Sequence, residues 1–455
     1  MLNSPFSTCF SWSTWTIIYD WSQCYCRHFG LLNSFGVETW SSMRRSKIVL
    51  ALARYVAMTA IMVAFSSLDF AATYKVLHAF SGKPDGGGLF DRLALDGSGS
   101  LFGTTWGGGA YGYGTVFQLT RNPAGAWNES ILYSFCSDPP ECHNGVASFN
   151  GVSLDAAGNL YGTVKGGAAG FIFQLAPMEP GSWRYTLIYD QGSTGDVTVD
   201  GAGNLYGEVG LGKCNAGEIL KLKPPPPGGD GWTAKDLYDF CPHNNRWNKG
   251  NSPNYGLTGD SAGNLYGVTY AGGKQNFGVA FQLEHTPSGW KEHVLHSFAG
   301  APDDGRYAWG GVAVDAAGNV YGATVAGGSE RCGGPGCGTI YKLTRQPDGK
   351  WKETILYRFP KLDDGAAPIG ALTMDPAGNL YGVAGGSSKE CSCGVVFKFA
   401  HNPNDTWTYS VLHRFHGTDG ALPVAGVILD AKGNIYGTTS TGGKGGYGVV
   451  FKITQ

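Results

Sequence analysis

Short segments in which apolar and polar residues alternate recur throughout residues 74–455, separated by Gly, Pro, Asn and Asp. Alternation with a period of two predicts β-strands, and the separating residues predict tight turns. The stretch that begins at Gly310 shows the full pattern. It contains four such segments, at residues 311–315, 319–324, 338–343 and 351–359. We therefore predict repeated units of four short strands.

The pattern Asp-x-x-Gly-Asn-Leu-Tyr-Gly links the first two strands of each unit and occurs, with variations, at intervals of 45–60 residues. Its seven copies begin at Asp96, Asp155, Asp200, Asp260, Asp315, Asp375 and Asp430. The copy at Asp96 is degenerate, with Ser in place of Asn and Phe in place of Tyr. A period of this length is typical of solenoids, propellers and other repeat arrays.

The two ends of the repeated region decide between a ring and an open array. The chain ends at Gln455, directly after the third strand of the last unit, and an unassigned fourth-strand segment lies at residues 74–80. An open solenoid would leave an unpaired edge at each end. We therefore predict an all-β fold, a seven-bladed β-propeller with four antiparallel strands per blade. It is closed by the N-terminal strand, which joins the last C-terminal blade.

Residues 43–72 have the pattern of a signal peptide. The segment from Met43 to Lys47 contains three basic residues, and an apolar stretch follows at 55–65. This stretch is short for a membrane span, and small residues come after it. An uncleaved anchor at 48–65 is the alternative. Residues 1–42 lie outside the repeat, and we expect a non-native or unstructured extension, with translation starting at Met43. Residues 73–455 would form the propeller, secreted or periplasmic, with no stable membrane span after cleavage and no anchor after Gln455.

Composition narrows the partners. The net charge is −2, and no run of Lys or Arg provides a footprint for nucleic acid. We expect a monomer without a cofactor. We also expect no metal, because no pair of cysteines has zinc-finger spacing. Eight cysteines follow the signal segment, and export favours disulfides. The disulfide candidates are Cys136, Cys142, Cys214, Cys241, Cys332 and Cys337, and the pairing of Cys391 and Cys393 stays open.

Residues that recur in every blade are expected to serve the blade. The seven repeat aspartates could form a cation-binding ring, but the turn itself favours capping of backbone amides. The Asp-Gly pairs in the variable loops are interpreted in the same way. His78, His296 and His413 share a fourth-strand position with Tyr and are interpreted as packing residues.

Residues that break the repeat are better candidates for function. The links between strands two and three and between strand four and the next blade share one face, here called the variable face. Aromatic and Arg side chains on this face would suit a sugar or peptide, although loop drift is the alternative. The candidate ligand-binding residues are Glu208, His243, Arg246, Trp247, Arg306, Tyr307 and Trp309.

The order of motifs in each unit resembles the GloVer tandem repeats of exported, choice-of-anchor bacterial proteins. These motifs are Asp-x-x-Gly-Asn-Leu-Tyr-Gly, Gly-Gly, Gly-Thr-Val-Phe-x-Leu and Leu-Tyr-x-Phe. The resemblance covers residues 74–455 and implies export, but no defined activity. We predict a non-catalytic propeller that binds an extracellular ligand or protein partner, with carbohydrate as one option, through its variable face. The alternative is a hydrolase or lyase acting on carbohydrate or a lactone at the channel mouth. Converging ionisable side chains there would favour the enzyme, which leaves the question of catalysis open.

Overall fold

The computed structural model describes residues 72–455, except 167–169, 180, 193–194, 211, 230, 243–246, 254–255, 330–331, 333–335, 361–364 and 387–392. The predicted N-terminal extension and signal peptide occupy residues 1–72, and all of these except Ala72 lie outside the described residues. The described residues form 31 strands and no helix. None of them therefore belongs to an apolar helix of membrane-spanning length.

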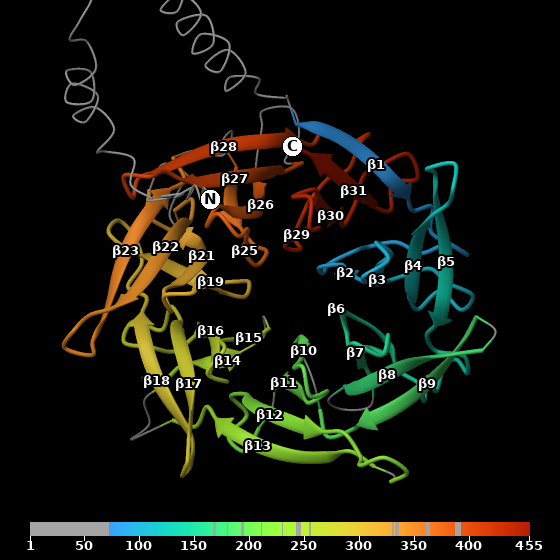
Figure 1. The fold of residues 1–455 in the computed structure, drawn as a ribbon, viewed down its shortest axis with the longest axis horizontal. Coiled ribbons are helices and arrows are strands. Elements are labelled where there is room, and N and C mark those ends of the chain that lie inside the picture. The colour runs from blue at the N-terminus through green and yellow to red at the C-terminus, as the bar shows by residue number, and fades with distance from the viewer. Residues whose placement is uncertain are drawn as a thin grey trace, which may run out of the picture. The chain divides into compact units, whose positions relative to one another are not determined.

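The strands form seven antiparallel sheets arranged as blades around a central axis, which confirms the predicted seven-bladed β-propeller (Figure 1). Blade 1 consists of β2 (Ala94–Leu95), β3 (Leu101–Thr105), β4 (Thr115–Arg121) and β5 (Trp127–Ser134). Blade 2 consists of β6 (Val146–Leu154), β7 (Leu160–Lys165), β8 (Phe171–Met178) and β9 (Ser182–Tyr189). Blade 3 consists of β10 (Val197–Val199), β11 (Leu205–Val209), β12 (Glu218–Lys223) and β13 (Thr233–Asp239). Blade 4 consists of β14 (Asn251–Pro253), β15 (Thr258–Gly259), β16 (Leu265–Ala271), β17 (Val279–Thr286) and β18 (Gly289–Ser297).

The later blades follow the same order. Blade 5 consists of β19 (Gly305–Ala308), β20 (Ala313–Val314), β21 (Val320–Gly327), β22 (Thr339–Arg345) and β23 (Trp351–Arg358). Blade 6 consists of β24 (Ala366–Pro368), β25 (Thr373–Met374), β26 (Leu380–Gly386), β27 (Val395–His401) and β28 (Trp407–Arg414). Blade 7 consists of β29 (Ile428–Leu429), β30 (Ile435–Thr439), β31 (Val449–Thr454) and β1 (Thr73–Ala79). The fourth strand of the last blade therefore comes from the start of the described chain.

The pairing of β1 with β31 closes the ring as predicted. The strands are antiparallel, from Thr73 opposite Thr454 to Ala79 opposite Val449. Phe80, which follows β1, is fully buried between blades 7 and 1, and its ring packs edge-on against Phe117 at 5.1 Å. The closing strand therefore contributes to the core as well as to the backbone ladder.

The inner strand of a blade differs from the sequence prediction. In blade 5 a continuous strand at 311–315 was expected, but the structure has β19 and β20, both paired with β21 and separated by residues 309–312. Blades 4 and 6 are split in the same way, which explains why three sheets contain five strands. In blade 2 the corresponding irregularity lies between Ala147 and Val152. Each of these segments is a bulge that leaves residues of the inner strand free to face away from the ladder.

The repeat aspartates cap the tight turn, as the sequence predicts. In blade 2, Asp155 Oδ1 accepts hydrogen bonds from the backbone amides of Ala157 and Asn159, each at 2.9 Å. Its Oδ2 accepts from Asn159 Nδ2 at 2.8 Å and from Tyr161 Oη at 3.0 Å. Burial acts to raise the pKa of the equivalent carboxyls, but these hydrogen bonds hold it below the usual range at Asp200, Asp260, Asp375 and Asp430. The motif therefore stabilises each blade, which weighs against a catalytic role.

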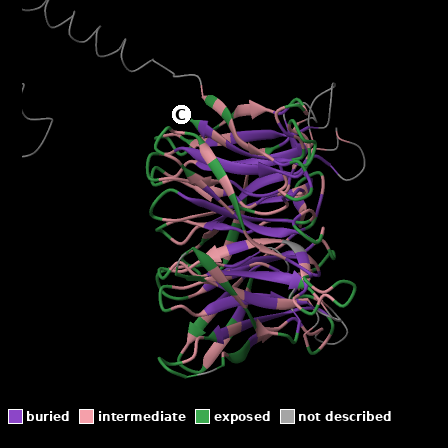
Figure 2. Ribbon diagram, turned by 90° about the vertical axis from the view of Figure 1, so that its right-hand side faces the viewer, coloured by how far each residue is buried: buried purple, intermediate pink, exposed green. Residues whose placement is uncertain are grey.

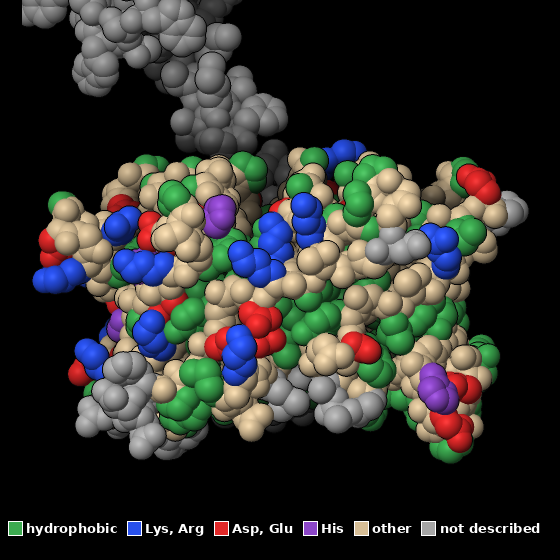
Figure 3. Space-filling model, turned by 90° about the horizontal axis from the view of Figure 1, so that it is seen from below, with side chains coloured by type: hydrophobic (Ala, Val, Ile, Leu, Met, Phe, Trp, Pro, Cys, Tyr) green, Lys and Arg blue, Asp and Glu red, His purple; other side chains and the backbone are tan. Residues whose placement is uncertain are grey.

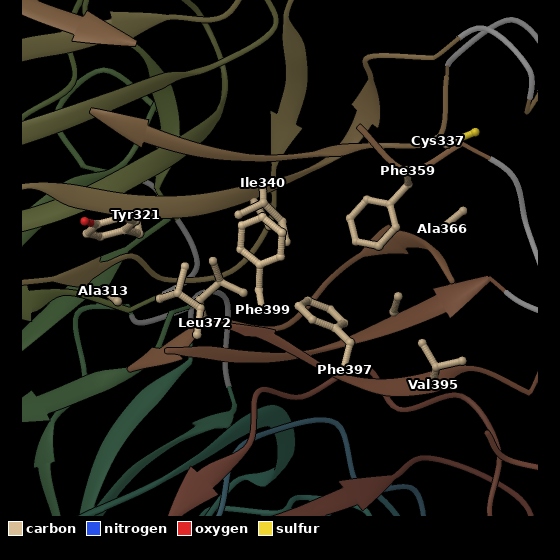
Figure 4. Close-up of a cluster of buried hydrophobic side chains, with 13 residues drawn as sticks. Ala313, Tyr321, Cys337, Ile340, Phe359, Ala366, Leu372, Val395, Phe397 and Phe399 are labelled. Atoms are coloured by element: carbon tan, nitrogen blue, oxygen red, sulfur yellow. The ribbon is translucent and has the colours of Figure 1, made fainter. Parts of the chain in front are cut away.

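The core lies between neighbouring sheets. Buried residues follow the middle strands of the blades, whereas exposed residues gather on the loops and outer strands (Figure 2). Between blades 5 and 6, the fully buried rings of Phe359 and Phe397 pack 5.9 Å apart, beside Ile340 and Phe399 (Figure 4). A Cβ added to Gly382 would lie 2.6 Å from Phe397 Cζ. The Gly of Leu-Tyr-Gly therefore makes room for the aromatic ring of the third strand.

Blade 5 differs from the other blades in this packing by one buried hydroxyl group, that of Tyr341. Tyr341 occupies the third-strand position held elsewhere by Phe117, Phe173, Leu220, Phe281, Phe397 and Phe451. Its hydroxyl is buried and has no hydrogen-bond partner among the described residues. Because an unsatisfied buried hydroxyl costs about 1–3 kcal/mol, Tyr341→Phe should raise the free energy of unfolding by a similar amount. Urea denaturation measures the change.

The matched control for this prediction is Tyr321→Phe in the same blade. Tyr321 Oη donates to Asp315 Oδ2 at 3.0 Å, so its removal should lower the free energy of unfolding by about 1 kcal/mol. The account of Tyr341 is wrong if both substitutions destabilise the protein equally.

The outer rim carries charges of both signs. On the side shown in Figure 3, Lys and Arg side chains lie among Asp and Glu side chains over the outer strands at the bottom of Figure 1, including β13. A surface of mixed sign lacks the strong positive field that favours nucleic acid.

Candidate functional site

The bulges of the inner strands meet around the propeller axis. A Cβ added to Gly310 in blade 5 would lie 2.7 Å from the backbone of Ile369 and Gly370 in blade 6. A Cβ on Gly370 would lie 2.4 Å from the backbone nitrogen of Gly426 in blade 7. Only glycine or a very small residue fits where the main chains come this close. At these glycines, the inner bulges of blades 5, 6 and 7 therefore pack backbone against backbone.

The other side of the axis carries polar side chains at the same repeat positions. These positions lie five and four residues before the repeat Asp. In chain order they hold Asp91–Arg92, Asn150–Gly151, Gly195–Asp196, Tyr255–Gly256, Gly310–Gly311, Gly370–Ala371 and Ala425–Gly426. Blades 1–3 thus supply Asp91, Arg92, Asn150 and Asp196, which we call the polar arc together with Glu208.

Asp91 ties the first blade to both of its neighbours. Its Oδ2 accepts a hydrogen bond from the backbone amide of Gly151 in blade 2. Its carbonyl oxygen accepts from Thr438 Oγ1 in blade 7 at 3.2 Å. Arg92 is exposed, and a Cβ on Gly426 would lie 3.0 Å from its Cδ atom. The Asp91 carboxylate is therefore held in place while the adjacent guanidinium remains accessible.

Asn150 and Glu208 continue the arc into blades 2 and 3. Asn150 Nδ2 donates to Thr163 Oγ1 at 2.7 Å and to the Gly195 carbonyl at 3.2 Å. Glu208 Oε2 accepts from the Gly256 amide in blade 4 at 3.1 Å, and the Glu208 side chain is fully buried. These contacts order the arc across four consecutive blades, a preorganised polar surface of the kind that ligand sites use.

Asp196 and Asp91 form a carboxyl pair. Burial raises the pKa of Asp196 well above the usual range, and the charge of Asp91 and a hydrogen bond between the two carboxyl groups raise it further. Glu208 acts in the same direction, and Arg92 opposes the shift. Two carboxyl groups that share a hydrogen bond hold one proton between them. The shared proton is used within the pair, and the remaining carboxyl lone pairs can accept hydrogen bonds from a ligand.

Exposed aromatic side chains gather on the same side of the ring as the variable loops. Trp106, Tyr111, Tyr113 and Tyr447, which we call the aromatic patch, are each at least 40% exposed. They lie in the links β3–β4 and β30–β31, which belong to the variable face of blades 1 and 7. Gly88 connects the two links, because its amide donates to the Tyr447 carbonyl and its carbonyl accepts from the Trp106 amide, both at 2.9 Å. The two links are therefore joined through Gly88, three residues before Asp91 of the polar arc.

Residues 232–451 match the Gloeobacter/Verrucomicrobia repeat. This stretch belongs to that repeat family. The match confirms the resemblance noted in the sequence. No curated protein matches the chain.

Several solved structures resemble the fold at low identity. A candidate oxidoreductase (glucose dehydrogenase) from Thermus thermophilus is 12% identical, with a TM-score of 0.39 over 84% of this chain and 100% of its own. The PQQ-bound aldose sugar dehydrogenase of Streptomyces coelicolor is 13% identical, with a TM-score of 0.41 over 84% and 98%. A Lactobacillus plantarum protein is 14% identical, with a TM-score of 0.47 over 78% and 99%. Similarity this slight carries no argument about chemistry.

The ligand-binding candidates from the sequence lie in different parts of the structure. Glu208 joins the polar arc described above. His243 and Arg246 lie outside the described residues. Trp247 is partly buried against the core between blades 3 and 4, and its carbonyl accepts hydrogen bonds from the amides of Gly250 and Gly273. Trp247 therefore supports its own loop.

Arg306, Tyr307 and Trp309 come together at the junction of blades 4 and 5. Tyr307 stacks on Tyr270 at 4.8 Å, and Trp309 meets Tyr270 edge-on at 5.7 Å. The Arg306 guanidinium lies 5.3 Å from the Phe277 ring centroid. Trp309 is 42% exposed and directly precedes Gly310 of the axial ring. Tyr307 and Arg306 thus pack across the two blades, whereas Trp309 presents an aromatic surface near the axis.

Sequence reasoning missed most of the polar arc. Asp91, Arg92, Asn150 and Asp196 precede the repeat Asp at positions where the later repeats carry mainly Gly or Ala. Aligning these positions across all seven units would have marked them as departures from the repeat. They lie at the start of the predicted first strand or directly before it, where a polar residue resembles an ordinary loop residue.

The disulfide candidates lie in the variable loops of the repeat. Cys136 pairs with Cys142, Cys214 with Cys241, and Cys332 with Cys337. Cys393 is also disulfide-bonded, and Cys391 lies outside the described residues. Disulfides of this kind fit an oxidising compartment.

The raised pKa of Asp196 predicts a pH effect on stability. The folded protein keeps a proton that the unfolded chain releases near pH 4, so this group's contribution to stability falls as pH rises above that value. Asp196→Asn removes the titration. The free energy of unfolding of the wild type should therefore fall relative to that of the variant as the pH rises above about 4, as measured by urea denaturation.

Asp348→Asn, on the exposed hairpin between β22 and β23, controls for the general loss of a carboxylate. A difference between wild type and Asp196→Asn that does not change with pH would contradict the shared proton.

Proposed function

We propose that this chain is an exported, non-catalytic propeller that binds a hydroxyl-rich ligand, such as carbohydrate, through its variable face. The observation that carries the proposal is the position of the exposed aromatic side chains. All five that are at least 40% exposed among the described residues lie in variable-face links or on an axial bulge. Flat aromatic rings that stay in water on one face of a rigid scaffold are typical of a recognition surface.

The polar arc supplies the complementary chemistry. Sugars present apolar C–H faces and many hydroxyl groups, so a site for them combines aromatic surfaces with fixed donors and acceptors. Asp91 and Asp196 can accept hydrogen bonds, and the exposed Arg92 guanidinium can donate them. Because the arc is held by contacts between blades, little conformational entropy is lost when a ligand binds.

Export is supported by the cysteines of the variable face. Among the described residues, Cys136–Cys142 and Cys332–Cys337 each close a variable loop, and Cys214–Cys241 joins two variable loops of blade 3. Such bonds persist outside the reducing cytosol and hold the loops in position. A ligand met outside the cytosol is consistent with this environment.

A glycan array tests the proposal. The protein comprising residues 73–455, produced under oxidising conditions, should bind one class of neutral glycans and should ignore polyanions such as heparin. A matched peptide array covers the alternative ligand class. Binding to peptides alone would overturn the carbohydrate assignment, and the absence of binding on both arrays would overturn the binding function.

The second candidate is a hydrolase or lyase that acts on carbohydrate or a lactone at the channel mouth. It is favoured by one specific observation, the hydrogen-bonded carboxyl pair of Asp91 and Asp196 beside Arg92. A protonated and an ionised carboxyl group in contact can serve as acid and base. Turnover of a glycan or lactone panel that is lost in Asp196→Asn, with binding retained, would select the enzyme over the binding protein.

A further inference from the structure

The outer strands of neighbouring blades meet through a recurring pair of side chains. One is the His or Tyr near the end of the fourth strand. The other lies two residues after the Trp near the start of the next blade's fourth strand. At the junction of blades 1 and 2, Tyr133 stacks on Tyr185 at 4.3 Å. At the junction of blades 5 and 6, Tyr357 stacks on Tyr409 at 4.7 Å. An aromatic stack is therefore a stable solution at this position.

The junction of blades 4 and 5 has a different composition. His296 of β18 replaces the first Tyr, and Glu353 of β23 replaces the second, while Asp304 comes from the loop that connects the two blades. His296 Nε2 lies 2.9 Å from Asp304 Oδ2 and 3.4 Å from Glu353 Oε2. One ligand atom from each of the three residues lies within 4.8 Å of the other two. Neighbouring blades thus bring an imidazole and two carboxylates to a single point.

These separations suit a metal ion. Nitrogen and oxygen ligands bind Zn²⁺ at about 2.0–2.2 Å in tetrahedral geometry, which places the ligand atoms about 3.4 Å apart. The side chains are only 10–22% exposed, so the group is sheltered but reachable from solvent. Two carboxylates and a neutral imidazole would balance the charge of a divalent ion. One histidine with two carboxylates is a ligand set that suits zinc and similar transition ions.

A separate observation points to a missing ligand. Glu353 Oε1 is buried and has no hydrogen-bond partner among the described residues. Arg358, whose charge also acts on Glu353, donates its Nη2 to the Asp303 carbonyl at 3.0 Å. A buried carboxylate oxygen without a donor costs free energy unless something compensates it. A bidentate or bridging contact to a cation would do so.

Neighbouring groups also hold the Asp304 and His296 side chains in place. Asp304 Oδ2 accepts a hydrogen bond from the Ala299 amide at 2.7 Å, and Oδ1 accepts from the Gly305 amide at 2.5 Å. The His296 ring packs edge-on against the fully buried Phe298 at 5.1 Å. Such outer contacts fix the direction of metal ligands before the ion arrives.

Comparison with two other clusters sharpens the assignment. Glu218, Asp236 and Asp239 also come together, but the Lys213 ammonium already lies 2.9 Å from Asp239 and 3.0 Å from Asp236. His78, Asp85 and Glu129 repeat the same residue types between blades 7 and 1, with His78 Nε2 at 3.1 Å from Asp85 Oδ1. Among the described residues, all three ligand atoms meet the mutual 4.8 Å separation only at the His296 junction when a histidine is required.

We propose that His296, Asp304 and Glu353 form a binding site for a divalent transition ion, with Zn²⁺ as the preferred ion, which clamps blades 4 and 5 together. Because β18 and β23 are neighbouring outer strands, an ion shared between them would resist separation of the blades (Figure 1). This site shares no residue with the polar arc, and the proposal does not depend on ligand binding at the variable face. It also revises the expectation from the sequence that the chain has no metal.

The test is a calorimetric titration of ZnCl₂ into protein that carries no histidine tag and has been treated with a chelator. The variant is His296→Tyr/Glu353→Tyr, which recreates the stack found at the junctions of blades 1 and 2 and of blades 5 and 6, and so should fold. His413→Tyr is the control, because His413 occupies the same position in blade 6 but faces Tyr74 rather than a glutamate.

We expect the double variant to lose one equivalent of bound Zn²⁺, while the His413→Tyr control retains it. Zn²⁺ should raise the unfolding midpoint of the wild type and the control but not that of the double variant, since an ion that binds only the folded state stabilises it. With Co²⁺ as a spectroscopic probe, the wild type should show the visible absorption of a four-coordinate site. Equal zinc stoichiometry in the wild type and the double variant would overturn the proposal.

Discussion

A chain that begins at Ser81, and therefore lacks β1 and Phe80, should fail to fold cooperatively. β1 pairs with β31 along its length, and Tyr74, Val76 and Phe80 pack into the cores on the two sides of blade 7. Burying one large apolar side chain contributes about 1.5–3 kcal/mol, and a whole domain is stable by only about 5–15 kcal/mol. Loss of these side chains together with the backbone ladder is therefore comparable to the entire stability. Circular dichroism during urea denaturation measures the effect.

A permuted chain provides the matched control. In it, residues 73–80 follow Thr454 through a five-residue link with the sequence of 122–126, which joins β4 to β5 in blade 1. The order of strands in blade 7 then equals that in blade 1, so the permuted chain should recover a cooperative transition. A truncated chain with the wild-type unfolding midpoint would contradict ring closure by β1.

Phe397→Ala should lower the free energy of unfolding by about 3–5 kcal/mol, the usual cost of removing a buried aromatic ring. The Phe397 ring is fully buried and packs on Phe359 (Figure 4). It also lies over Gly382 and packs on Tyr409. Because sheets on both sides hold it, the space cannot collapse easily. The cost should therefore lie in the upper part of the range seen for core substitutions.

Phe397→Leu is the control, since Leu220 occupies the same repeat position in blade 3 and is also buried. Leucine should cost less than half as much as alanine in the same urea denaturation experiment. If alanine and leucine cost the same, the ring contacts described for this position do not carry the stability of the blade junction.

The architecture could be predicted because its signals are local and repeated. The unpaired fourth-strand segment before the first repeat and the missing fourth strand after the last predicted the pairing of β1 with β31. Asp155 and its equivalents were recognised as turn caps because the side chain lies beside the amides that it binds. Each of these features follows from residues within a few positions of each other, or from two chain ends.

The sites were harder to predict because they depend on contacts between blades. The inner bulge was missed since its glycines resemble the start of a strand, and the bulge forms only where seven blades crowd one axis. Asp91 and Asp196 are about a hundred residues apart, and only ring closure around the axis brings their carboxyl groups together. His296 was interpreted as a packing residue. Its ring does pack on Phe298, but the sequence gives no sign that Glu353 faces it.

The central claim is that the variable face binds a hydroxyl-rich ligand through the aromatic patch, and one affinity measurement tests it most directly. The best glycan from the array is titrated into the wild type, into Trp106→Ala/Tyr447→Ala, and into Met178→Ala, a comparably exposed apolar residue outside the variable face, in the β8–β9 hairpin. We predict that the affinity is at least about tenfold weaker in the double variant and unchanged in Met178→Ala, since central aromatics dominate recognition surfaces. Equal affinity in all three proteins would contradict the claim.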